Sequence, residues 1–128
     1  MIIGYAYVVA DLLHVGHLNF LEKCKDQCDE LWVGVLTDGA CKEKKPKPII
    51  PFDERMIMVR SLKCVDHVTE QRFYSPLDNA RFFDVLFESD SHDKKDIAKA
   101  KKLMKVIVIP YFPDQSSTKI KEKIRGKS

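Results

Sequence analysis

Five short runs of apolar, β-prone residues alternate along this chain with segments of helical periodicity. The runs lie at residues 2–9, 31–37, 66–69, 84–88 and 106–109. The second run is continuously apolar, which is typical of a parallel strand buried on both faces. Strands that alternate with helices at this spacing pair in parallel. We therefore predict an α/β fold with a five-stranded parallel sheet and helices on both faces.

The segments between these runs predict the helices and one long loop. We expect helices at residues 17–28, 54–63 (capped by Asp53), 93–104 and 116–125, and a short helix beginning near Pro76. Residues 38–52 are polar, basic and interrupted by prolines. This composition predicts a loop, and a loop of this length is often a functional cover. Ligands of parallel α/β sheets bind at the carboxyl ends of the strands, so we expect the site in the turns that follow them.

The composition is that of a single globular domain, residues 1–128, with 45% apolar and 32% charged residues. No apolar run is long enough to cross a membrane, and the first residues do not resemble a secretory leader. We therefore expect a cytoplasmic protein whose cysteines are reduced thiols. The net charge of +3 suits anionic substrates. A nucleic-acid-binding module would need a basic stripe with exposed aromatic side chains, so no nucleic-acid partner is predicted.

Two histidines flank a glycine just after the first predicted strand, in the segment His14-Val-Gly-His17. Gly16 allows the backbone to approach a ligand closely. The helix that follows offers unpaired N–H groups and the positive end of its dipole. Two imidazoles at the same place can donate hydrogen bonds to phosphate oxygens. A single histidine would more often be a capping or surface residue, but this combination predicts an anion-binding site.

The segment Asp11–Leu21, which contains the histidine pair, resembles the cytidylyltransferase-like nucleotidyltransferases, and most of all glycerol-3-phosphate cytidylyltransferase and its phosphocholine and phosphoethanolamine relatives. Four further elements of that family follow in order over nearly the whole chain: Val33–Asp38, Phe52–Arg55, Val65–Asp66 and Ser116–Ile120. The resemblance implies a Rossmann-like form of the predicted sheet. It also implies an enzyme that transfers CMP from CTP to a small phosphorylated or phosphonylated alcohol, releases pyrophosphate and forms no covalent intermediate.

The resemblance also assigns roles to individual residues. The catalytic residues that it implies are His14, His17, Lys44 and Arg55. The nucleotide-binding residues that it implies are Val9, Ala10, Asp11, Gly16, Asp90, Ser116, Ser117 and Thr118. The acceptor-binding residues that it implies are Lys47, Asp66 and Tyr111. Mg²⁺ is expected on the phosphates, held mainly by water and substrate oxygens, with Asp11 as the one side chain that could support a histidine or the ion. A homodimer is also expected.

Three segments depart from the family's pattern. Val8–Asp11 stands where the family has Gly-Thr-Phe-Asp, Ser89–His92 where it has Gly-Asp-Asp-Trp, and Tyr111-Phe112 where it has Arg-Thr. These segments belong to the substrate site, so they leave the acceptor open. Ala10–Asn19 and Ile109–Tyr111 look similar to the cytidylyltransferase modules of phosphonate biosynthesis. Adenylyltransferases of the same fold share the His-x-Gly-His pattern of His14–His17, and the departures from the family's pattern also allow a catalytically weak nucleotide-binding protein.

Overall fold

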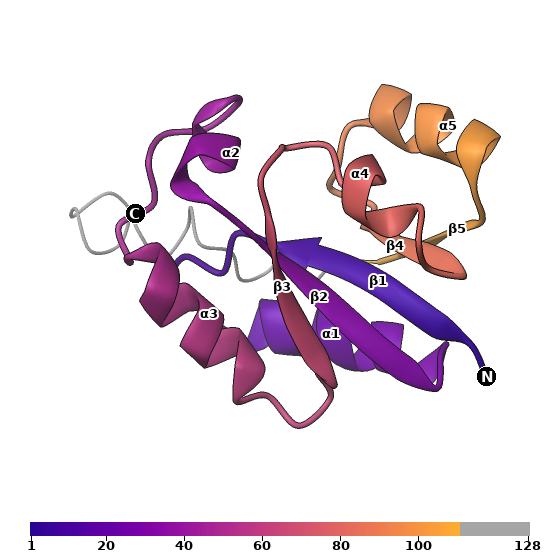
Figure 1. Ribbon diagram of the computed structural model, residues 1–128, viewed down its shortest axis with the longest axis horizontal. Helices are drawn as coiled ribbons and strands as arrows, with labels where there is room; N and C mark the ends of the chain where they lie inside the picture. Colours follow the sequence, from indigo (N-terminus) through magenta and orange to yellow (C-terminus); the bar gives the residue numbers. More distant parts are fainter. Residues whose placement is uncertain (111–128) are drawn as a thin grey trace.

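The sheet has five strands, all paired in parallel, as the sequence predicts. The computed structural model describes residues 1–110. The strands are β1 (Ile3–Val8), β2 (Glu30–Leu36), β3 (His67–Gln71), β4 (Val85–Ser89) and β5 (Val106–Ile109). Their order across the sheet is β3-β2-β1-β4-β5 (Figure 1). This arrangement confirms the predicted Rossmann-like α/β fold.

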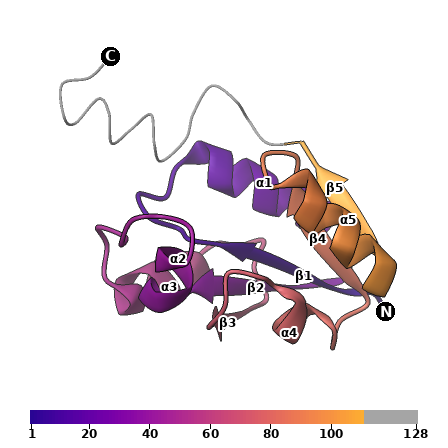
Figure 2. The same ribbon diagram turned by 90° about the horizontal axis from the view of Figure 1, so that it is seen from above.

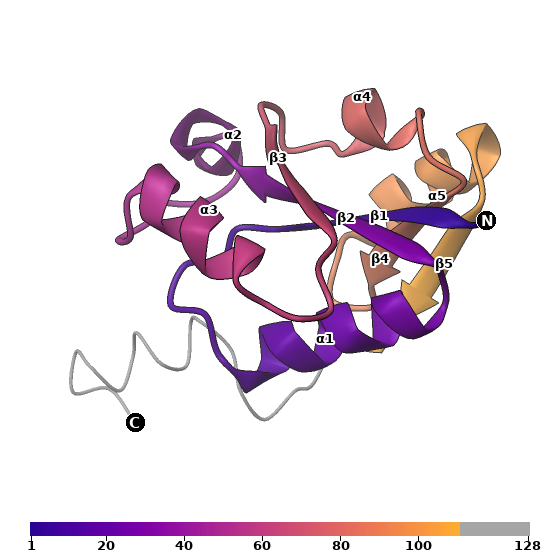
Figure 3. The same cartoon turned by 60° about the horizontal axis from the view of Figure 1, so that its bottom comes forward.

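Helices cover both faces of this sheet. They are α1 (Val15–Asp26), α2 (Asp38–Lys42), α3 (Phe52–Arg60), α4 (Leu77–Ala80) and α5 (Lys94–Leu103). The helices α1 and α3 lie on one face, and α2, α4 and α5 lie on the other (Figures 1 and 3). In residues 1–110 no helix has the length and apolar character needed to cross a membrane.

Each face of the sheet has its own apolar core because successive residues of a strand point to opposite sides. From β1, Ala6 and Val8 pack toward α1 and α3. The intervening Tyr5 and Tyr7 pack with residues of α2, α4 and α5 on the other face. The central strands are therefore buried on both sides, which explains why their sequences read as continuous apolar runs.

Several element boundaries differ from those predicted. The predicted loop 38–52 begins with the short helix α2, which is capped by the Thr37 hydroxyl accepting a hydrogen bond from the Ala40 N–H (3.1 Å). Five residues are too few to show a helical period, so periodicity could not reveal this helix. Asp53 is not the cap of α3, because that helix begins at Phe52. The helix α1 begins earlier than predicted, at Val15, and His14 is its cap.

The strand order has one switch point, between β1 and β4. The chain moves from β1 outward to β2 and β3 and then returns to the other side of β1 to form β4. In Figure 2 the β1 arrow points toward α2 and α3, so the carboxyl end of the sheet lies there. Ligands of open parallel sheets bind at the carboxyl ends of the strands beside such a switch point.

Candidate active site

The turn between β1 and α1 lies at this carboxyl end and has an unusual backbone. Ala10 (φ 61°) and Leu12 (φ 57°) adopt the left-handed conformation, which costs a residue with a side chain roughly 1–2 kcal/mol. Asp11, between them, is buried, and its two carboxylate oxygens accept hydrogen bonds from the backbone N–H groups of Ile49 (3.0 Å) and Ile50 (2.9 Å). Asp11 therefore holds the strained turn against the segment that precedes α3.

The two histidines lie at the start of α1 and cap it. Nδ1 of His14 accepts a hydrogen bond from the backbone N–H of Gly16 (2.9 Å). Nδ1 of His17 accepts one from the backbone N–H of His14 (3.2 Å). These contacts satisfy N–H groups that the first turn of a helix leaves unpaired. The ring centroids lie 4.1 Å apart, so the structure brings the predicted pair together, with the buried Gly16 in the same turn.

These contacts determine which ring nitrogen carries the proton. A neutral imidazole accepts with one nitrogen and donates with the other, and Nδ1 is the acceptor in both rings, so Nε2 carries the proton. Burial lowers the pKa of His14. Burial, followed by the charges of His14 and Lys45, lowers the pKa of His17 to about 3, and Asp11 opposes this shift. Near pH 7 both rings are neutral hydrogen-bond donors.

Nε2 of His14 is buried and has no hydrogen-bond partner within residues 1–110. A buried donor without a partner costs about 1–3 kcal/mol, so such groups usually mark a place where a ligand or water binds. The adjacent helix terminus favours negative charge at the same place. The first turn of α1 is therefore built to receive an anionic oxygen.

The lowered pKa of His17 predicts a dependence of stability on pH. The unfolded chain takes up a proton on this residue below about pH 6.5, whereas the folded protein does so only near the pKa of about 3. Below pH 6.5 the unfolded state therefore binds more protons, and the free energy of unfolding falls by up to roughly 1.4 kcal/mol per pH unit. Above pH 6.5 His17 does not change the free energy of unfolding with pH. Urea denaturation of the wild type and His17→Gln between about pH 7.5 and 4.5 measures the difference.

Titration of other groups contributes to both curves, so the difference between wild type and variant isolates His17. The difference should be constant above pH 6.5 and should change in favour of the variant as the pH falls. Parallel curves over the whole range would show that the pKa of His17 is not lowered in the folded protein.

Arg55 does not reach toward a substrate in this structure. Its side chain is completely buried in α3. The guanidinium donates to the backbone carbonyls of Val9 (2.7 Å), Leu36 (2.7 Å) and Ile50 (3.0 Å), and it forms an ion pair with Asp38 (2.6 Å). These partners come from the ends of β1 and β2, the loop and the start of α2. These contacts occupy the guanidinium and make Arg55 a positioning residue in this structure, and the catalytic role implied for it stays a prediction.

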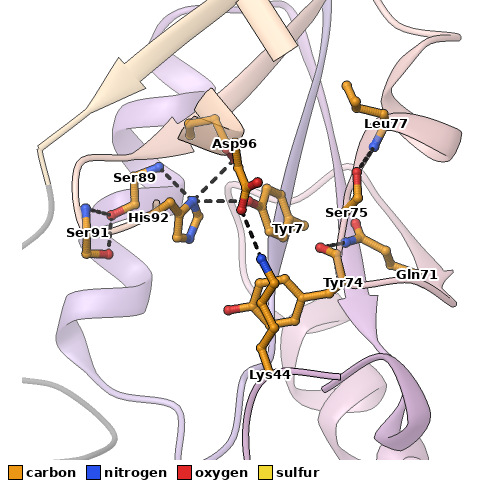
Figure 4. Close-up of polar contacts among 11 residues, drawn as sticks. Tyr7, Lys44, Gln71, Tyr74, Ser75, Leu77, Ser89, Ser91, His92 and Asp96 are labelled. Carbon is orange, nitrogen blue, oxygen red and sulfur yellow. Dashed lines mark hydrogen bonds and ion pairs between the residues drawn. The ribbon is translucent and has the colours of Figure 1, made fainter. Parts of the chain in front are cut away.

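The lysines of the loop are distributed differently from the prediction. Nζ of Lys44 pairs with Asp96 of α5 (3.1 Å) and lies 5.1 Å from the centre of the Tyr74 ring (Figure 4). Because α5 covers the face opposite α1, these contacts direct Lys44 away from the histidine pair. The charge of Lys45 lowers the pKa of His17, so Lys45 lies closer to the histidine turn in its electrostatic effect than Lys44 does. Lys47 is exposed.

Two further aspartates that the sequence analysis assigned to the site lie at opposite ends of the strands. Asp66 precedes β3, accepts from the Leu31 N–H and pairs with Lys25, both at 2.7 Å. Hydrogen bonding from Lys25 lowers the pKa of Asp66. This position is at the amino ends of the strands, whereas ligands of such sheets bind at the carboxyl ends, so it gives the predicted acceptor role no support. Asp90 follows β4, where its backbone N–H donates to the Ile109 carbonyl (3.2 Å), so it lies at the carboxyl end as predicted.

The described side chains do not fit a resident metal ion. In residues 1–110 no group of three or more His, Cys, Asp or Glu side chains is placed to hold one. Both oxygens of Asp11 accept backbone N–H groups. A magnesium ion would therefore arrive on the phosphates of a nucleotide. The remaining predicted site residues lie outside the described part of the chain: Tyr111, Ser116, Ser117 and Thr118.

Two carboxylates have roles that the sequence analysis did not assign. Asp38 pairs with the buried guanidinium of Arg55. Glu88 is buried near the end of β4, where its Oε1 lies 3.2 Å from Nδ1 of His92. A signal for Glu88 was present, because it is an acid within the predicted strand 84–88, directly after the apolar residues Val85–Phe87. No local sequence pattern indicates that Asp38 pairs with Arg55.

Comparison with known proteins shows the family of this chain. Residues 9–123 match the model of a family described as cytidylyltransferase-like. The fold and the histidine turn define a nucleotidyltransferase, and the chain belongs to the cytidylyltransferase-like family of that superfamily.

Two curated relatives and one solved structure illustrate the range of the family. The chain is 43% identical over 70 residues to an FAD synthase of Methanocella arvoryzae, covering 52% of this chain and 49% of that protein. It is 32% identical over 119 residues to the bifunctional protein HldE of Helicobacter hepaticus, covering 90% of this chain and 25% of that protein. The chain thus spans half or less of these relatives. A lipopolysaccharide core biosynthesis protein from Thermoplasma volcanium is similar in structure, with a TM-score of 0.71 and 25% identity. The match covers 88% of this chain and 97% of that protein.

Proposed function

We propose that this domain transfers a nucleotidyl group from a nucleoside triphosphate to a phosphate or phosphonate oxygen of a small acceptor. The acceptor oxygen attacks the α-phosphorus and forms a new P–O bond. The bond between the α-phosphorus and the oxygen that bridges to the β-phosphate breaks, and pyrophosphate leaves with that electron pair. Because the attacking oxygen is already anionic, no group on the protein has to remove a proton.

The observation that carries this proposal is the buried, unpartnered Nε2–H of His14 at the start of α1, within the described residues 1–110. His14 and His17 would donate to phosphate oxygens of the nucleotide as charge develops around the transferred phosphorus. Neutral donors suit this task because burying an unpaired imidazolium would cost more than burying a neutral ring. The strained turn, held by Asp11, keeps these donors in place before the nucleotide binds.

Two nucleoside triphosphates, CTP and ATP, are candidates for the source of the nucleotidyl group, and each is supported by a different observation. CTP is supported by the ordered sequence elements and by the family's cytidylyltransferase-like description. ATP is the second candidate, because a relative that shares 43% identity with this chain is an FAD synthase. We expect CTP, with a CDP-alcohol or the matching phosphonate product. The match over residues 9–123 supports residues 1–128 as one domain. Pairing into a homodimer stays a prediction.

The test is pyrophosphate release from the full chain with Mg²⁺ and either CTP or ATP. The acceptor panel contains glycerol 3-phosphate, phosphocholine, phosphoethanolamine, hydroxyalkylphosphonates and aminoalkylphosphonates. We expect release with CTP and one acceptor class. Release with ATP alone would identify the adenylyltransferase. Nucleotide binding without release from either donor would overturn the proposal in favour of a protein that binds nucleotide without transferring it.

A further inference from the structure

A second group of titratable side chains lies at the switch point, on the face of the sheet opposite the histidine pair. Tyr7 is near the end of β1, Glu88 is near the end of β4, and His92 follows β4 by three residues. Tyr7 belongs to the core on the side of α4 and α5. Carboxyl ends of strands beside a switch point form the usual binding crevice of this architecture. The group is therefore placed for a role in the site.

The side chains of Tyr7 and Glu88 both contact the same ring nitrogen of His92, Nδ1. Nδ1 of His92 lies 3.1 Å from the Tyr7 hydroxyl and 3.3 Å from the Ser89 nitrogen (Figure 4), and it lies 3.2 Å from Oε1 of Glu88. Without a proton Nδ1 accepts from the Ser89 N–H, and with one it donates to Glu88. The rings of Tyr7 and His92 also stack, with centroids 5.0 Å apart and planes 27° apart. Position and tilt of the imidazole are therefore both constrained.

The arrangement exposes one edge of the imidazole. Glu88 is 1% exposed, and a buried carboxylate persists only when nearby donors stabilise it. Within residues 1–110 the hydrogen bonds and the ion pair of the His92 ring are all made by Nδ1. Its side chain is 27% exposed. Nε2 is therefore the nitrogen that remains available for a ligand, and the carboxylate of Glu88 keeps the ring turned that way.

A cation lies on the same side of the sheet. Burial raises the pKa of Tyr7, followed by the charge and hydrogen bond of Glu88 and the charges of Tyr74 and Asp96. Asp96 and Tyr74 also contact the ammonium group of Lys44 (Figure 4). This face of the switch point thus carries an imidazole and an ammonium group, the pair of groups that an anionic acceptor needs.

We propose that Nε2 of His92 binds the phosphate or phosphonate group of the acceptor, and that Glu88 and Tyr7 are positioning residues for this contact. The inference rests on the proposed function. In an in-line transfer the attacking and leaving oxygens lie on opposite sides of the phosphorus. If the triphosphate binds at the α1 turn, the acceptor approaches the phosphorus from the opposite side of the switch point. His92 lies on that side, beside Tyr7 on the face of the sheet that α1 does not cover. His92 stands where the family pattern that this chain resembles has tryptophan, so that pattern does not include this contact.

Two substitutions of His92 separate a binding role from a structural one. His92→Asn keeps a polar atom near the position of Nδ1 and removes the outward donor, whereas His92→Gln places an amide nitrogen near the position of Nε2. We expect His92→Asn to raise the KM for the acceptor about tenfold or more, with the KM for the nucleotide unchanged. His92→Gln should recover part of the loss. Glu88→Gln should raise the acceptor KM less than His92→Asn.

The chain offers a matched control at the amino ends of β2 and β3. There Glu30 pairs with His67 (3.2 Å), and His67 lies against the ring of Trp32, with centroids 4.4 Å apart. His67→Asn and Glu30→Gln should leave both KM values unchanged. An equal loss of kcat for His92→Asn and His92→Gln, with an unchanged acceptor KM, would overturn the inference and make the group purely structural.

A binding measurement keeps the inference testable even if no acceptor turns over. Inorganic phosphate is added to the full chain, and the ring ¹⁵N signals of the histidines are followed by NMR in the wild type and Glu88→Gln. We expect a saturable shift of the His92 signals that weakens in Glu88→Gln. A response from His14 or His17 without one from His92 would overturn the inference. Failure of pyrophosphate release with every donor and acceptor would instead overturn the proposed function, so the two failures are distinguishable.

Discussion

Replacing His14 with asparagine is expected to lower kcat for nucleotidyl transfer by about 10²–10³ while the fold is retained. The asparagine carbonyl can accept the hydrogen bond that Nδ1 of His14 now takes from the Gly16 N–H, and asparagine is among the best helix N-caps. The substitution removes Nε2, the buried donor without a partner within residues 1–110, together with the outer part of the ring that lies against His17. The loss therefore measures the contact with the developing charge and not the stability of α1.

The measurement is steady-state pyrophosphate release together with the urea midpoint of each protein. His67→Asn is the matched control, because His67 is half-exposed at the amino edge of β3 and caps no helix within the described residues. Its kcat should equal that of the wild type. If His14→Asn retained full activity, the proposal that the first turn of α1 binds the transferred phosphate would fail. A lowered urea midpoint alone would assign His14 to capping.

Replacing Arg55 with methionine is expected to lower the free energy of unfolding by about 3–5 kcal/mol. Methionine fills much of the same volume but cannot donate to the carbonyls of Val9, Leu36 and Ile50. These acceptors would lose a charged donor in a place that water reaches poorly, and Asp38 would lose its ion-pair partner. The loss should be large because Arg55 joins the ends of two strands to the segment that precedes α3.

Urea denaturation at constant pH gives the change, and Arg60→Met is the control from the same helix. Arg60 is exposed, so its replacement should change the free energy by no more than about 0.5 kcal/mol. Asp38→Asn and the double variant Arg55→Met/Asp38→Asn complete a cycle that isolates the ion pair. If Arg55→Met were as stable as the wild type and only the acceptor KM increased, Arg55 would contact substrate after all.

The histidine pair is the part of the site that neighbouring residues in the sequence were enough to predict. His14, Gly16 and His17 are within one helical turn, so their relative position follows from the helix itself once α1 begins at Val15. Predicting this turn required only the strand before it and the helix after it, and the structure brings the two histidines together. Asp11 differs, because it lies outside α1 and its carboxylate is held by the N–H groups of Ile49 and Ile50 from a distant part of the chain.

Asp66 shows that a family likeness can override a simpler rule. A residue that precedes a parallel strand lies at the amino end of the sheet, whereas ligands bind at the carboxyl end. The predicted strand at residues 66–69 therefore already argued against an acceptor role for Asp66. In the structure Asp66 lies at that amino end, where it binds Lys25 and the backbone of Leu31.

The alternation of apolar runs and helical segments was enough to predict the sheet, its parallel pairing and the position of the histidine turn. These features depend on periodicity and short-range sequence, which a chain carries in one dimension. The partners of Arg55 and the direction of Lys44 depend on segments from different parts of the chain that pack together. So does the burial of Glu88 against His92 and Tyr7. The free energy of a charge is set by its surroundings in three dimensions, so only the folded structure could decide which charged residues support the site and which could contact a substrate.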